Sequence, residues 1–88
     1  MKLTYYQDPG HGWIATTNAM IQKLGIAGKI SHYSYTDGDR VFLEEDLDAY
    51  HLVNALRATG EPIEIVESFS KTDSFIRRLP RFNKDSAQ

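Results

Sequence analysis

The segment of residues 31–60 constrains the fold more than any other part of this 88-residue sequence. It contains Asp37-Gly38, a dipeptide that tolerates the positive φ angles of a two-residue type I′ hairpin turn. Tyrosines alternate with smaller polar residues before this dipeptide, and apolar residues alternate after it. The sequence therefore predicts a β-hairpin formed by residues 30–35 and 40–44.

An amphipathic helix is predicted directly after the hairpin. Apolar residues recur at i, i+3, i+4 and i+7, namely at Ala49, Leu52, Val53 and Leu56, so that one face of the helix belongs to the core. Four acidic residues crowd the start of this helix, where they complement the positive end of its dipole: Glu44, Glu45, Asp46 and Asp48. Gly60, which precedes Glu61-Pro62, ends the helix.

The other predicted elements are shorter. Residues 2–7 and 63–67 are expected to form strands, and residues 13–15 a brief extended segment. Thr16 or Thr17 is a suitable N-cap for a first helix, and Gly25 is placed to end it in the left-handed conformation. The order β-α-β-β-α-β is typical of an α+β fold in which two helices cover a small antiparallel sheet, as in ferredoxin-like or related folds.

The end of the sequence differs from the rest in charge. Residues 1–70 carry five Lys or Arg and ten Asp or Glu, whereas residues 71–88 carry five and two. The same segment contains large apolar residues that a solvated tail would not need. We therefore predict an α+β domain of residues 1–68 and a basic, aromatic C-terminal extension of residues 69–88, which packs on the domain or on a partner subunit.

Length and composition narrow the class of protein. Eighty-eight residues suffice for one domain with a small core. The apolar runs are too short to span a membrane, so no membrane partner is expected. There is no cysteine and no apolar leader of the secretory type, which favours a cytoplasmic location.

The segment from Asp8 to Trp13 is the first candidate for a binding site. Backbone amides around Gly10 and Gly12 can form an anion nest, the side chain of His11 can bind or titrate, and Trp13 can stack on a planar ring. The same residues also suit a simple turn in which the indole anchors the core, and the sequence leaves both interpretations open. A P-loop is excluded, because no Gly-Lys-Ser or Gly-Lys-Thr follows.

Three arginines near the C-terminus, Arg77, Arg78 and Arg81, are the second candidate. A guanidinium is planar and matches phosphate or carboxylate with two hydrogen bonds. The three side chains can clamp a nucleotide-like ligand or an acidic partner surface, or they can pair with the acidic body of the domain. The sequence does not decide between these uses.

Signatures of catalysis and of metal binding are missing from the sequence. The histidines, His11, His32 and His51, belong to no HExxH motif, and no cysteine pair completes a ligand set. Tyr33 and Tyr35 share a strand face, where core packing or a subunit interface is favoured over base stacking. We therefore predict no catalytic residue, no metal ligand and no cofactor.

Several short motifs form one pattern over residues 6–77, namely DPGHGW, LGI, YSY, GD and LEED followed by an arginine. Together they resemble small proteins of bacteriophages and mobile elements. The resemblance implies a phage context rather than a mechanism. In that context a small protein of this kind is expected to act in the host cytoplasm against a host defence system.

The favoured function is a non-enzymatic binding module, assembled as a small homo-oligomer, that sequesters an anionic, nucleotide-like ligand. The expected ligand-binding residues are Gly10, His11, Gly12, Trp13, Arg77, Arg78 and Arg81. One alternative is a protein–protein inhibitor that holds a host protein through the acidic surface around Asp46 and Asp48. Further alternatives are a nucleic-acid binder, which the acidic body disfavours, and a small enzyme with His11 as general base.

Overall fold

The computed structural model describes residues 1–83 and shows a small α+β fold, as predicted. Within these residues one sheet is built from five strands: β1 (Lys2–Gln7), β2 (Gly12–Thr17), β3 (Tyr35–Asp37), β4 (Arg40–Glu44) and β5 (Glu64–Phe69). Two α-helices, α1 (Asn18–Leu24) and α2 (Ala49–Ala58), accompany two short 3₁₀ turns, η1 (Ala27–Lys29) and η2 (Phe75–Arg78). None of the helices in this part of the chain is long and apolar enough to cross a membrane.

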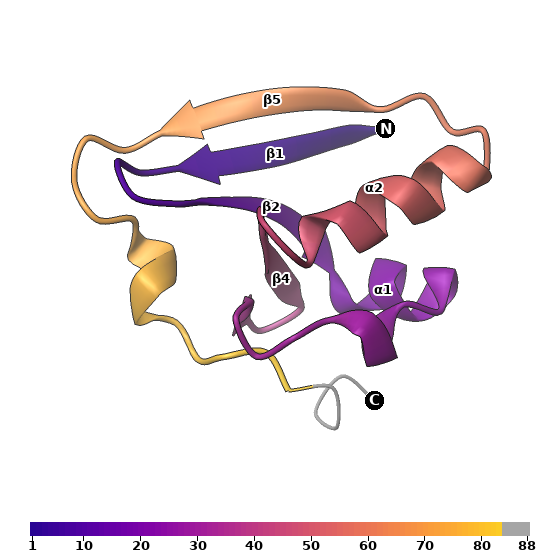
Figure 1. The fold of residues 1–88 in the computed structure, drawn as a ribbon, viewed down its shortest axis with the longest axis horizontal. Coiled ribbons are helices and arrows are strands. Elements are labelled where there is room, and N and C mark those ends of the chain that lie inside the picture. The colour runs from indigo at the N-terminus through magenta and orange to yellow at the C-terminus, as the bar shows by residue number, and fades with distance from the viewer. Residues whose placement is uncertain (84–88) are drawn as a thin grey trace.

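The sheet is mixed, so the expectation of a purely antiparallel sheet is wrong. Its strand order is β3-β4-β2-β1-β5, and every neighbouring pair is antiparallel except β1 and β5. These two strands run parallel in register from Lys2↔Glu64 to Gln7↔Phe69, and their arrows point the same way in Figure 1. The ferredoxin-like arrangement is therefore not confirmed. The segment of residues 13–15 is a full strand, which adds a fifth member to the sheet.

Local signals fix the first strand and the first helix. The strand of residues 2–7 is confirmed with the predicted bounds. Of the two predicted N-caps, Thr17 is the one used, because its hydroxyl accepts a hydrogen bond from the amide of Met20 at 3.1 Å. Gly25 follows the helix with a φ of 69°, and the amide of Ile26 reaches back to the carbonyl of Ile21 at 3.2 Å. This is the helix end that the sequence predicts.

The hairpin is shorter than predicted and has a different turn. Asp37 pairs with Arg40, so the two turn residues are Gly38 and Asp39 rather than Asp37-Gly38. The φ of Gly38 is 62°, and no non-glycine residue among those described has a positive φ. A positive φ at the first turn position alone belongs to type II′, whereas type I′ needs it at both. The predicted type I′ turn is therefore wrong.

Residues 30–34 are not a strand, although the hairpin prediction included them. The buried carboxylate of Asp48 accepts hydrogen bonds from the hydroxyls of Ser31 and Ser34 at 2.7 and 2.5 Å, and from the amide of Ser31 at 3.0 Å. These bonds hold the segment against the start of α2 instead of along β4. Asp48 therefore stabilises a loop and does not act as the exposed dipole partner that the sequence suggested.

Successive side chains along the strands point to opposite faces of the sheet, where they pack into two separate cores. Val41 and Leu43 join the larger core with both helices, whereas Phe42 points to the other face. Leu52 and Leu56 of α2 are buried against the larger core, as their spacing predicts. On the other face, Phe42 contributes to a smaller buried cluster together with Trp13, Tyr35 and Ile76. In Figure 1 the two helices lie together, apart from the η2 turn.

The C-terminal extension crosses the sheet and contributes to both cores. Ile76 of η2 is fully buried in the smaller cluster, and Phe82 is buried in the larger core. Between them the chain bonds to the edge of β3, where the amide of Thr36 donates to the carbonyl of Pro80 at 2.8 Å. The backbone of the extension thus covers the outer edge of β3. The last five residues of the predicted extension, 84–88, lie outside the described part.

Candidate functional site

A cavity of about 380 Å³ opens beside the smaller core. Its wall combines aromatic rings, two arginines, and a histidine that faces two carboxylates. The residues come from the β1–β2 loop and the start of β2, from the segment before β3 and its first residue, from the end of β4 and the turn after it, and from the C-terminal extension. The topology thus gathers in one place residues from both candidate segments of the sequence, the glycine loop and the arginine segment.

The buried carboxylate of Asp8 joins these two segments. Its Oδ1 accepts the amides of Gly10 and His11 at 3.0 and 2.9 Å, and its Oδ2 accepts the amide of Ser74 at 2.9 Å. Arg77 completes the arrangement through Nε to Oδ2 at 2.6 Å and Nη2 to Oδ1 at 2.8 Å. The hydrogen bonds from Arg77, followed by those from the three amides, lower the pKa of Asp8 far below its usual range despite burial. The same contact raises the pKa of Arg77.

The anion nest predicted in the glycine loop is already filled by the protein itself. The amides of Gly10 and His11 point to Asp8 rather than to an external anion. Neither Gly10 nor Gly12 lines the cavity. A Cβ on Gly12 would meet the ring of Tyr5 at 2.5–2.7 Å, so this glycine leaves the space that the tyrosine ring occupies. Both glycines shape the loop, and of the four predicted loop residues His11 and Trp13 reach the cavity.

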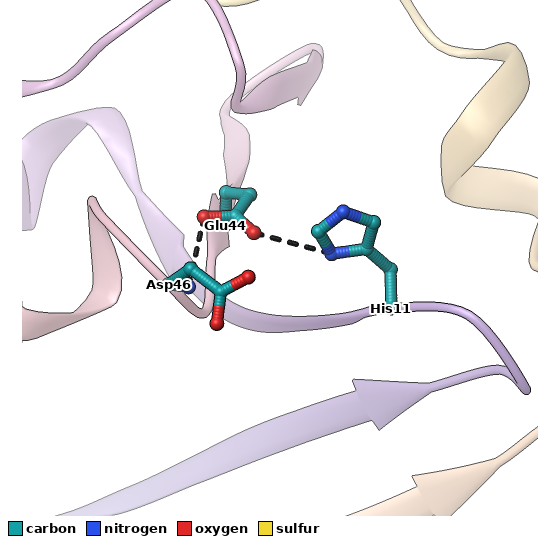
Figure 2. A group of neighbouring side chains, drawn as sticks. All are labelled: His11, Glu44 and Asp46. Atoms are coloured by element: carbon teal, nitrogen blue, oxygen red, sulfur yellow. Dashed lines mark hydrogen bonds and ion pairs between the residues drawn. The ribbon is translucent and has the colours of Figure 1, made fainter.

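His11 faces an acidic pair that sequence reasoning did not connect with it. Its Nδ1 lies 3.1 Å from Oε2 of Glu44, and Figure 2 shows the carboxylate of Asp46 turned toward the same space. The other oxygen of Glu44 accepts the amides of Asp46 and Leu47 at 2.8 and 2.9 Å, which fixes the turn after β4. Glu44 is buried, and neither acid lies in the first turn of α2. The interpretation of these acids as partners of the helix dipole is therefore wrong.

Two of the three predicted arginines meet at the cavity. The guanidinium of Arg77 lies over the ring of Trp13 at 5.4 Å, and that of Arg81 over the ring of Tyr35 at 4.6 Å. Arg81 is exposed and its Nη1 lies 3.5 Å from the carbonyl of His32. Arg78 is exposed but does not line the cavity. The arginine segment therefore contributes two side chains to the site rather than three.

Tyr33 provides the accessible ring that was expected of Trp13. The indole of Trp13 is almost completely buried, with Tyr35 edge-on at 6.3 Å and His11 tilted over it at 5.7 Å. Tyr33 is 52% exposed, lines the cavity and stacks on His32 at 4.7 Å. The sequence placed this tyrosine on a strand face, where core packing or a subunit interface was favoured over base stacking, so it was not among the predicted site residues. In the structure Tyr33 lies before β3.

The acidic surface of the alternative inhibitor hypothesis is smaller than the sequence suggested. Asp48 is 2% exposed and belongs to the interior, so it cannot present charge to a partner. Asp46 remains exposed beside the cavity. Glu45 faces the opposite direction and accepts a hydrogen bond from the hydroxyl of Tyr5. That hydrogen bond, with burial and the nearby negative charges, raises the pKa of Tyr5 to about 12.

Comparisons with protein-family models, with curated proteins and with solved structures find no match for this chain. The resemblance to phage and mobile-element proteins therefore stays a prediction from the motifs quoted above.

Proposed function

We propose that this protein is a non-enzymatic binding module that sequesters an anionic, nucleotide-like ligand in the cavity. The observation that carries the proposal is the exposed guanidinium of Arg81, held over Tyr35 beside the exposed ring of Tyr33. Phosphate is bound by guanidinium groups and a base is bound by stacking on an aromatic ring, so this pair matches both halves of a nucleotide. A volume of about 380 Å³ lies within the usual range of small-molecule sites.

In this proposal Arg77 contributes more to the rigidity of the site than to direct binding of the ligand. Two of its nitrogens are occupied by Asp8, which fixes the guanidinium over Trp13 and leaves Nη1 outside the bidentate pair. A side chain that is already held in place loses little entropy when a ligand arrives. In this proposal Arg81 supplies the charge that neutralises the ligand, and Arg77 adds one directed donor.

Calorimetry and native mass spectrometry with a panel of mononucleotides and cyclic dinucleotides test this proposal. We expect saturable 1:1 binding to one member, weakened at least tenfold by Arg81→Ala, because a charge-assisted pair contributes about 1.5–3 kcal/mol. Arg78→Ala is the matched control, since this exposed arginine belongs to the same segment but not to the cavity. If no nucleotide binds, or if both variants weaken binding equally, the proposal fails.

A second candidate function follows from the contact between His11 and Glu44. A carboxylate beside one imidazole nitrogen orients the ring, as is required of a general base. A small His-dependent enzyme would convert its ligand, whereas a sequestering protein returns it unchanged. Mass spectrometry of the ligand after prolonged incubation separates the two, and turnover that is lost in His11→Ala would favour the enzyme.

We further propose a bacteriophage accessory or counter-defence role in the host cytoplasm, which rests on the resemblance of the sequence motifs. The alternative partner is a host defence protein held through the acidic surface around Asp46. Charge reversal by Asp46→Lys would abolish such a complex, while Arg81→Ala would abolish nucleotide capture.

Direct nucleic-acid binding is not favoured. A retardation assay in which any shift lacks steep salt dependence would count against it.

We also propose that the protein is a homo-oligomer that assembles through the outer edge of β5. Among residues 1–83 this strand pairs with β1 on one side only, and all six of its residues are exposed. The amide of Glu64 donates to the carbonyl of Met1, the residue before β1, and the amide of Ser70 donates to the carbonyl of Gln7 in β1. Residues of the opposite parity, Ile65, Glu67 and Phe69, therefore point their amides outward. A second β5 can pair antiparallel around Val66. In that register Ile65 meets Glu67, and no two like charges stand directly opposite.

A further inference from the structure

Three potential metal ligands converge on one wall of the cavity. The imidazole of His11 and the carboxylates of Glu44 and Asp46 each offer a ligand atom, and these atoms all lie within 4.8 Å of one another. They come from the β1–β2 loop, from the last residue of β4 and from the turn that follows it, and in Figure 2 they face a common space. The sequence predicted no metal site, because none of the three belongs to a spacing motif.

The contact between His11 and Glu44 leaves one polar atom of each side chain without a hydrogen bond among residues 1–83. Nδ1 is shielded from solvent and, although Oε2 lies at 3.1 Å, it has no hydrogen-bond partner among residues 1–83. The side chain of Glu44 is only 8% exposed, and its hydrogen bonds within this part of the chain all go to Oε1. A buried carboxylate oxygen aimed at an imidazole nitrogen without a hydrogen bond suits a shared cation between or beside them.

We propose that His11, Glu44 and Asp46 bind a divalent first-row transition metal ion such as Mn²⁺ or Zn²⁺. Ligand atoms that each lie about 2.1 Å from one ion are roughly 3.0–3.4 Å apart at adjacent positions, which matches the distance between Nδ1 and Oε2. One imidazole with two carboxylates favours these ions over Mg²⁺, which prefers oxygen ligands and keeps its water. Asp46 is exposed and can close the remaining distance by side-chain rotation.

Hydrogen bonds from the rest of the protein hold two of the three ligand residues in place, as is usual in metal sites. The two amides that bind Oε1 orient Glu44, and Asp8 fixes the backbone of His11 through the amide of that residue. Three protein ligands leave the remaining coordination positions directed at the cavity, where water or a phosphate oxygen can complete the shell. The ion would also offset two negative charges that otherwise oppose an anionic ligand. The metal site itself does not need that ligand.

Two titrations of the chelator-treated protein test the proposal: Mn²⁺ alone, followed by electron paramagnetic resonance and calorimetry, and Zn²⁺ alone, followed by calorimetry because this d¹⁰ ion gives no resonance signal. We expect one saturable site that Asp46→Asn and His11→Gln each weaken at least tenfold. Asp46 is exposed, so its variant keeps the fold, whereas Glu44→Gln also disturbs the turn after β4. Glu45→Gln is the matched control, because this neighbouring carboxylate binds Tyr5 on another face, and it should leave the affinity unchanged.

Two results would contradict the metal site without affecting the nucleotide proposal. Either no saturable binding of Mn²⁺ or Zn²⁺ up to millimolar concentration, or binding that survives both Asp46→Asn and His11→Gln, would show that the pair of His11 and Glu44 is a plain ion pair. Nucleotide binding in chelator would then still support the proposed function. Metal binding without any nucleotide binding would leave the metal site standing and remove the proposed ligand.

Discussion

Arg77 binds Asp8 through two hydrogen bonds of 2.6 and 2.8 Å, although the two residues are 69 positions apart. The carboxylate belongs to the loop between β1 and β2 and the guanidinium to η2, so the contact joins the C-terminal extension to the first hairpin. The carboxyl is buried, while the guanidinium remains partly accessible beside the cavity. This pair therefore links the stability of the fold to the shape of the candidate site.

Asp8→Asn should destabilise the protein by about 2–4 kcal/mol. The amide cannot form the charged pair with Arg77, and its NH₂ group would face the donors of Arg77 or Ser74, which leaves buried groups without acceptors. Chemical denaturation at pH 7 measures the change. Asp73→Asn is the control, because Asp73 is 83% exposed and 4.0 Å from the same guanidinium, and it should cost less than about 1 kcal/mol. Equal losses in both variants would contradict a structural role for Asp8.

The stability that Asp8 provides should disappear in acid. The pKa of Asp8 in the folded protein is lowered by Arg77 and by three amides, whereas an unfolded Asp titrates near pH 3.9. Below that value the unfolded chain takes up a proton that the native state does not, so the free energy of unfolding falls as the pH falls. The difference between wild type and Asp8→Asn should be constant from pH 6 to 8 and should shrink from about pH 4 downward. A difference that is independent of pH would contradict the assigned ionisation.

Local rules explain the parts of the fold that the sequence predicted. The hydroxyl of Thr17 caps α1, and the positive φ of Gly25 ends that helix, because each depends on neighbours a few residues away. The face of α2 follows from its 3.6-residue period, and β1 from its alternation. Even the wrong turn type is a local error, since a shift of one residue moves the glycine from the second to the first turn position.

The candidate site could be predicted only in part, because long-range pairing builds it. His11 reaches Glu44 since β2 lies between β1 and β4, and this strand order leaves no trace in local composition. The conspicuous DPGHGW motif does mark the right loop, but its first residue, Asp8, is the one that organises it. The acidic residues at the end of β4 and in the turn after it look alike in the sequence. They have separate roles only once the strands place them on different faces.

Gly12→Ala should destabilise the protein by about 1–3 kcal/mol, the usual cost of forcing an extra carbon into a filled space. The new Cβ would lie 2.5–2.7 Å from the hydroxyl end of Tyr5, which must move and give up its hydrogen bond to Glu45. Thermal unfolding compared with Gly28→Ala gives a matched test, because a Cβ on Gly28 meets nothing within 4 Å. The control should be neutral or slightly stabilising. A neutral effect at position 12 would mean that Tyr5 does not hold this position.

Tyr5 should stabilise the protein at neutral pH and lose that effect in strong alkali. Its pKa is raised to about 12 by the hydrogen bond to Glu45, by burial and by nearby acids, whereas an unfolded tyrosine titrates near pH 10. Between these values the unfolded chain releases a proton that the native state keeps, so the free energy of unfolding falls as pH rises. The stability difference between wild type and Tyr5→Phe should therefore be present at pH 8 and decline between about pH 10 and 12. Glu45→Gln should lower the pKa of Tyr5 in the folded protein, so that the decline still begins near pH 10 but ends at a lower pH, and an unchanged curve would contradict the contact.

Glu67→Pro should convert an oligomer into a monomer without unfolding the sheet. The amide of this residue points away from β1, so proline removes a donor from the outer edge of β5 and keeps the bonds that join β5 to β1. Glu67→Thr is the matched control, since it also loses the side-chain contact with Gln7 but retains the amide. Light scattering across a range of concentrations should show wild type and the threonine variant as dimers and the proline variant as a monomer, with association weakened at least tenfold. A wild-type protein that stays monomeric at high concentration, or a proline variant that associates as wild type does, would show that β5 is not the interface.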